Sequence, residues 1–170
     1  NGSSASGIVV GAFRATHNSI QGNLIGPDRS GMRTLSAAQA GVYISVPDNL
    51  VGGSDPGAIN VISGNASGIA TTSFGDNRPG SRIEGNLIGL AVDGITPLGN
   101  TFDGIAIGNG GRVAGNTIAY NRAGVVVSSG TANLITRNSI FENQDSGIEL
   151  PGALDTNDVP PESDPPDQDT

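Results

Sequence analysis

The chain has 170 residues and a formal net charge of −8, from sixteen acidic and eight basic residues, and it contains no cysteine. This composition excludes a disulfide framework and a thiolate metal site, and the single histidine excludes a multi-histidine metal site. The sequence contains no basic cluster of the kind that favours nucleic-acid binding. No apolar run approaches the roughly 18 residues that a membrane span needs.

Two short phrases recur along the chain. The first is a small residue, then glycine, then alternating aliphatic residues, at 6–10, 40–44, 67–70, 103–107, 123–127 and 146–150. The second reads Asn-x-Ile-x-x-Asn, at 18–23, 60–65, 116–121 and 138–143, with a variant lacking the first asparagine at 81–86. Short alternating runs of this kind predict strands rather than helices.

The repeats also keep a longer register. The interval from Asn23 to Asn86 equals the interval from Gly41 to Gly104, which indicates an internal duplication. Later in the chain the repeat shortens to a step of about 20–23 residues. A unit this small cannot bury its apolar face alone and must stack on copies of itself.

We therefore expect an all-β fold, a parallel β-helix (solenoid) over residues 1–150. It would have about six turns, each of about 20–23 residues, and two longer inserted loops, at 27–39 and 90–102. One group of isoleucines should point inward: Ile20, Ile25, Ile62, Ile83, Ile88, Ile118, Ile135 and Ile140. Glycine and asparagine are expected at the corners, where a positive φ is needed.

The phrases Asn-Leu-Ile-Gly, Asn-Val-Ile-Ser-Gly-Asn and Ser-Gly-Ile resemble those of right-handed parallel β-helix repeat proteins of the pectate-lyase-like superfamily. The likeness is to large secreted or surface bacterial proteins and covers about residues 5–150. It implies a right-handed solenoid in an extracellular or cell-surface setting. The fold hosts lyases, hydrolases, adhesins and passive fibres, so it does not fix an activity.

The asparagines are expected to form a structural ladder, because stacked amides at one corner can hydrogen-bond along the axis. One set occupies equivalent positions: Asn23, Asn60, Asn86, Asn116 and Asn138. A second set contains Asn65, Asn121 and Asn143.

If the protein is an enzyme, carboxylates must carry the chemistry, as in a polysaccharide lyase or a glycoside hydrolase. The acids to test are Asp93, Asp103 and Asp145, and we expect solvated corner acids instead of a convergent pair. His17 has no acidic neighbour nearby in the sequence and is expected to face solvent. The arginines fall at different points of the repeat, which predicts a scattered set and not a stripe for acidic polysaccharide. The two inserted loops are either binding elements or architectural ones.

Residues 151–170 form an acidic, proline-rich tail. From residue 155 onward it holds six acids and no base, whereas residues 1–154 hold ten acids and eight arginines, so most of the negative charge is in the tail. Its oxygen-bearing side chains suit calcium and form one candidate metal site: Asp155, Asn157, Asp158, Asp164, Asp167 and Asp169. The alternatives are binding to the β-helix flank or to a neighbouring molecule.

The favoured function is that of an extracellular, non-enzymatic structural module that assembles into a fibre or cell-surface layer. The partners expected are other copies of the chain or neighbouring parts of a parent protein. The alternatives are a polysaccharide-active enzyme and a carbohydrate-binding adhesin, for which the six aromatic residues offer a thin stacking surface.

Overall fold

The computed structural model describes residues 5–12, 14–35, 39–72 and 80–150, in which sixteen strands form three parallel sheets. Sheet A contains β1 (Ile8–Val10), β4 (Ala40–Ile44), β7 (Ser67–Thr71), β10 (Ile105–Ile107), β13 (Val125–Val127) and β16 (Ile148–Glu149). Sheet B contains β2 (Ser19–Ile20), β5 (Leu50–Gly52), β8 (Arg82–Glu84), β11 (Arg112–Ala114) and β14 (Leu134–Thr136). Sheet C contains β3 (Leu24–Ile25), β6 (Val61–Ile62), β9 (Leu87–Ile88), β12 (Thr117–Ala119) and β15 (Ser139–Phe141).

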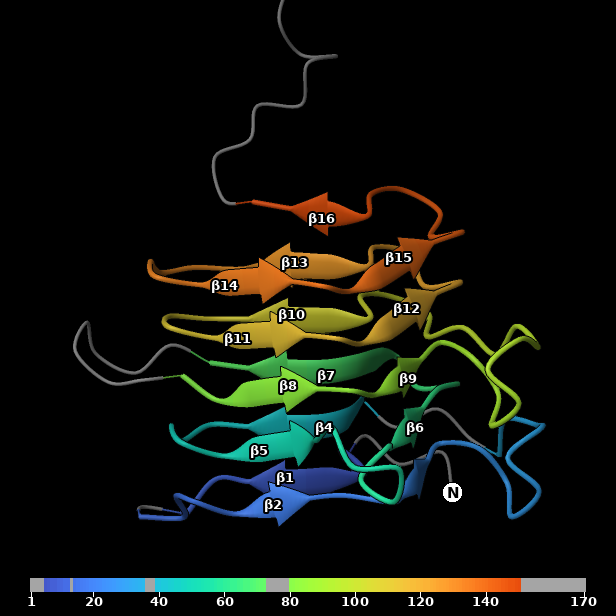
Figure 1. Ribbon diagram of the computed structural model, residues 1–170, viewed down its shortest axis with the longest axis horizontal. Coiled ribbons are helices and arrows are strands. Elements are labelled where there is room, and N and C mark those ends of the chain that lie inside the picture. Colours follow the sequence, from blue (N-terminus) through green and yellow to red (C-terminus); the bar gives the residue numbers. More distant parts are fainter. Residues whose placement is uncertain (1–4, 13, 36–38, 73–79, 151–170) are drawn as a thin grey trace, which may run out of the picture.

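The chain visits the three sheets in a fixed order and returns one rung higher each time, which is a parallel β-helix (Figure 1). Equivalent residues stack in register, so that Ile118 lies between Ile88 and Ile140 in neighbouring strands of sheet C. Each inner strand pairs through its backbone with the turns below and above, about 4.8 Å away. The predicted fold class is confirmed.

The core is a column of aliphatic side chains inside the three sheets. Ile62, Ile83, Ile88 and Ile118 are fully buried, and Ile20 and Ile25 are nearly so, as the repeat predicted. Ile135 and Ile140, in the last turn, pack against this cluster but remain partly exposed. The buried side chains from Ile20 to Val127 therefore form one continuous apolar column along the rod.

The expectation of a positive φ holds for one class of glycine and not for another. Gly85 and Gly115, which precede ladder asparagines, have φ values of 66° and 64°. The glycine at or just before the start of a sheet A strand has a different role, because it lets neighbouring turns pack closely. Gly104 has no positive φ, but a Cβ on it would lie 2.8 Å from the Gly124 carbonyl oxygen and 2.8 Å from Ile118 Cγ2. The chain passes so close to the core and to the next turn that no side chain fits there.

The asparagines in the described part of the chain do not adopt the positive φ expected of them. Non-glycine residues with a positive φ in the described chain are of other types, such as Tyr120, Arg137 and Glu142. Arg137 stands one turn above Gly115, and its φ of 55° matches the 64° of that glycine. The asparagines contribute through their side chains and not through their backbone conformation.

The two inserted loops fold alike and touch each other. Each closes with an antiparallel bridge, Pro27 to Thr34 in one and Leu90 to Pro97 in the other. The Val92 amide donates to the Gly31 carbonyl oxygen at 3.1 Å, so the loops meet across the intervening turn. Both project from the same side of the rod (Figure 1). In the described ranges no helix is long and apolar enough to cross a membrane.

Candidate functional site

The asparagine ladder runs along the corner between sheets B and C. The side-chain amide of each asparagine donates to the Oδ1 of its equivalent one turn on, at 2.9–3.0 Å. The five residues linked in this way are those predicted, Asn23, Asn60, Asn86, Asn116 and Asn138. Asn60, Asn86 and Asn116 are at most 1% exposed. This corner is a structural element in which the amides satisfy buried backbone groups.

A second ladder lies at the corner between sheets C and A. It links Asn65, Asn100, Asn121 and Asn143 through bonds of 2.8–3.4 Å. Asn100 was absent from the predicted set because it lies in an inserted loop and lacks the surrounding phrase. A third, shorter link joins Asn18 to Asn49 at 2.9 Å, and neither predicted set contains these two residues.

Asp93, one of the three candidate catalytic acids, forms part of a loop turn. Its carboxylate accepts hydrogen bonds from the Thr96 hydroxyl at 2.6 Å and from the amides of Thr96 and Ile95 at 2.8 and 2.9 Å. These bonds, the hydroxyl bond first, lower the pKa of Asp93 below its ordinary value of 3.8. Asp28 has the same arrangement in the first loop, bound to Ser30 at 2.6 Å, and its pKa is lowered too. Asp93 therefore stabilises its loop as a carboxylate.

We expect Asp93 to titrate with a pKa below 3.8 in a ¹³C NMR titration of its carboxyl group. Because its pKa is lowered in the folded state, its contribution to stability is present above the unfolded pKa and is lost as the pH falls through the folded pKa. Asp93→Asn removes this part of the pH dependence and serves as the control. A midpoint at or above the ordinary value contradicts the assignment.

The other two candidates, Asp103 and Asp145, lie on one side of the rod. They come just before β10 and β16 of sheet A, and Arg122 comes just before β13, the strand between these two. Asp103 Oδ1 is 2.9 Å from Arg122 Nη2, and the Asp145 amide donates to the Arg122 carbonyl oxygen at 2.8 Å. The hydrogen bond with Asp103, followed by the charges of Asp103, Asp145 and Glu149, raises the pKa of Arg122. Arg122 also lies 5.7 Å from the centre of the Phe102 ring. An arginine charge therefore stands where a pair of free catalytic carboxylates would have to converge.

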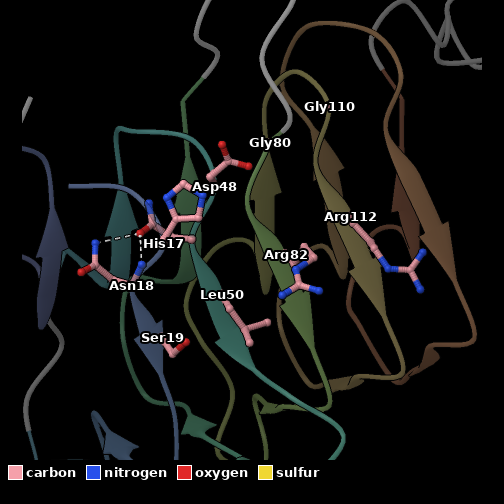
Figure 2. A pocket seen from close by; sticks show the side chains of 10 residues that line it. His17, Asn18, Ser19, Asp48, Leu50, Gly80, Arg82, Gly110 and Arg112 are labelled. Atoms are coloured by element: carbon pink, nitrogen blue, oxygen red, sulfur yellow. Dashed lines mark hydrogen bonds between the residues drawn. The ribbon is translucent and has the colours of Figure 1, made fainter. Parts of the chain in front are cut away.

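A groove of about 490 Å³ opens over sheet B and its edge toward sheet A (Figure 2). His17 and Asp48 border it from successive turns, and the His17 amide donates to the Asp48 carbonyl oxygen at 2.7 Å. His17 Nδ1 lies 3.0 Å from the Thr16 hydroxyl. The histidine is exposed as predicted, but the fold brings an acid beside it from the next turn of the chain.

Two arginines cross the floor of this groove. Arg82 and Arg112 lie directly opposite each other on β8 and β11, and both project from the outer face of sheet B (Figure 2). Arg112 Nε is 2.9 Å from Glu84 Oε1, whereas Arg82 has no ion pair with any other residue that the structure describes. The expectation of scattered arginines is therefore wrong for this pair. The signal was present, since both open the pattern Arg-aliphatic-x-Gly-Asn.

A second groove, of about 410 Å³, adjoins the first through Arg112. Glu84, Arg112 and Arg137 supply its charged side chains, and Arg137 comes from the corner that follows β14. Like Arg82, Arg137 has no ion pair within the described ranges. The two grooves thus form one surface, here called the sheet B face, whose charged residues are Asp48, Arg82, Glu84, Arg112 and Arg137.

Among the described residues, no group of three or more His, Cys, Asp or Glu side chains is placed to hold a metal ion. The predicted calcium ligands of the tail, Asp155, Asn157, Asp158, Asp164, Asp167 and Asp169, lie outside the described residues. No family model, no curated protein and no solved structure matched the chain.

Proposed function

We propose that the protein is an extracellular, non-enzymatic β-helix module of the pectate-lyase-like type. In this proposal, copies stack end to end into a fibre or surface layer. Its candidate catalytic acids support this, because Asp93 is bound within its own loop and Asp103 is paired with Arg122. The observation that carries the proposal is the apolar surface of the last described turn.

That turn leaves inward-facing residues uncovered. Ile148 on β16 is 47% exposed, whereas its partner Val125 one turn inside is fully buried. Leu150 is 55% exposed, and Ile140 is only partly buried although Ile118 beneath it is fully buried. A further stacked turn would remove this surface from water and stabilise the assembly.

The ladders make the two ends complementary. In the first ladder each asparagine donates toward the next turn, except Asn138 in the last turn, which donates only to the Val113 carbonyl oxygen and to no further asparagine in the described chain. Conversely, the Asn23 Oδ1 in the first turn has no donor among the described residues. Stacking the last turn of one copy on the first turn of another would match donors with acceptors. Such a contact is head to tail and does not close on itself, which favours a filament.

The test compares Ile148→Arg with Leu134→Arg by size-exclusion chromatography with light scattering and by electron microscopy. We expect the unmodified chain to form concentration-dependent oligomers, and Ile148→Arg to remain monomeric because it places a charge on the stacking surface. Leu134 is 48% exposed in the same turn but faces outward from sheet B, so Leu134→Arg should still assemble. A monodisperse monomer at every concentration, with a native far-UV spectrum, overturns the proposal.

A further inference from the structure

The sheet B face carries arginines without ion-pair partners in a protein that is otherwise short of positive charge. Arg82 and Arg112 are directly opposed on neighbouring strands, an arrangement that destabilises a sheet when both residues carry the same charge. Glu84 offsets Arg112 at 2.9 Å, but Arg82 and Arg137 are exposed and unpaired within the described ranges. The face therefore has a net positive charge, from three arginines against Asp48 and Glu84, and it suits an anionic ligand.

The chain itself contains a segment of the opposite charge. Residues 155–170 hold six acids and no base, so this segment accounts for six of the eight net negative charges. A carboxylate about 4 Å from an arginine is attracted to it, and the attraction is stronger beside a protein surface than in bulk water. Several such contacts along one groove would add, and each would weaken with added salt.

The segment is long enough to reach the arginines. Twenty residues follow Leu150, and they span up to about 66–72 Å when extended. Arg112 lies one strand inside β14, at one edge of sheet B, and Arg82 lies two strands inside. At about 4.8 Å per strand, both are within about 10 Å of that edge. Because the segment is tethered, its effective concentration at this face is in the millimolar range, which favours it over the same segment of another copy.

We propose that the acidic segment 155–170 binds across the sheet B face of its own chain, with its carboxylates at Arg82, Arg112 and Arg137. The geometry that supports this is a groove crossing neighbouring strands, lined by guanidinium groups and joined at Arg112 to a second groove. The contact is independent of the end-to-end stacking proposed above, because it uses the side of the rod and not its end.

The absence of cysteine makes the test direct. In the Ile148→Arg chain, which the stacking proposal expects to stay monomeric, Ser163→Cys introduces one thiol, which takes a nitroxide spin label, and amide peak intensities are read by ¹H–¹⁵N NMR. We expect the amides of residues 82 and 112 to lose intensity at about 0.1 M salt. They should regain it at about 1 M, where the screening length is about 3 Å. Intensities that are unaffected at the lower salt concentration overturn the proposal.

Two variants and one mixed sample complete the test. Arg82→Gln combined with Arg137→Gln should abolish the broadening. Arg29→Gln combined with Arg33→Gln, in the exposed first loop, makes the same change in charge and should leave it intact. Broadening that survives the first pair of substitutions overturns the assignment to these arginines. A mixture of ¹⁵N-labelled chain without the spin label and unlabelled chain with it should show no broadening, and broadening there would assign the face to another copy.

Discussion

Asn116→Ala is expected to lower the free energy of unfolding by about 3 kcal/mol. The side-chain amide of Asn116 donates to the Ile83 and Ala114 carbonyl oxygens at 2.9 and 3.2 Å, and to Asn138. Its Oδ1 accepts from the Asn86 backbone amide at 2.9 Å. Alanine would remove all of these bonds and leave buried polar groups without partners, which costs more than the loss of a bond that water can replace.

Urea denaturation followed by circular dichroism measures the effect, and Asn23→Ala is the matched control. Asn23 stands in the same ladder, but it is exposed and in the first turn, so water replaces its lost bonds. We expect Asn23→Ala to cost about 1 kcal/mol or less. Equal effects of the two substitutions would show that burial in the ladder is not what makes Asn116 important.

Gly104→Ala is expected to cost about 3 kcal/mol or more, although it adds a single methyl group. The new Cβ would lie 2.8 Å from the Gly124 carbonyl oxygen, 2.8 Å from Ile118 Cγ2 and 2.9 Å from Asn121 Nδ2. None of these neighbours is the free end of a flexible side chain, because one is backbone, one is core and one belongs to the second ladder. The turn would have to separate from its neighbour to make room.

Two other glycines separate the cost of crowding from that of backbone conformation. A Cβ on Gly57 meets nothing within 4 Å, so Gly57→Ala should change stability by less than about 0.5 kcal/mol. Gly115 is equally open but has a φ of 64°, so Gly115→Ala should cost about 1–2 kcal/mol. Chemical denaturation should rank the three costs in the order Gly104, Gly115, Gly57. If Gly104→Ala costs no more than Gly115→Ala, the close approach of the turns has been overestimated.

The repeat made the fold and the first ladder predictable. A fixed spacing between isoleucine and asparagine repeats the same inward position in every turn, so Ile62, Ile88 and Ile118 could be assigned to the core from the sequence alone. The reason for the recurring glycine phrase of sheet A could not be predicted, since a close approach to the next turn depends on how the sheets meet at the corner. Spacing alone does not distinguish that cause from a positive φ.

Contacts between different turns were harder to predict than positions within one. His17 and Asp48 lie in successive turns and touch through their backbones. The stretch of chain between them is longer than the repeat step of the later turns, so that step did not predict their contact. The pairing of Arg122 with Asp103 depends on how far a side chain reaches across one rung. Arg82 and Arg112, in contrast, were predictable, because both precede the same Gly-Asn pair of the ladder.

The contact between the two inserted loops has a consequence for how the rod can grow. The loops occupy equivalent places in the two copies of the duplicated unit, and they meet through Val92 and Gly31 across the turn that has no insertion. A further copy of this unit would bring a third loop to the same place, with the same contact available. Each copy of the duplicated unit therefore carries a loop that can contact the loop of its neighbour, and a rod built from further copies would keep one continuous row of loops along this side.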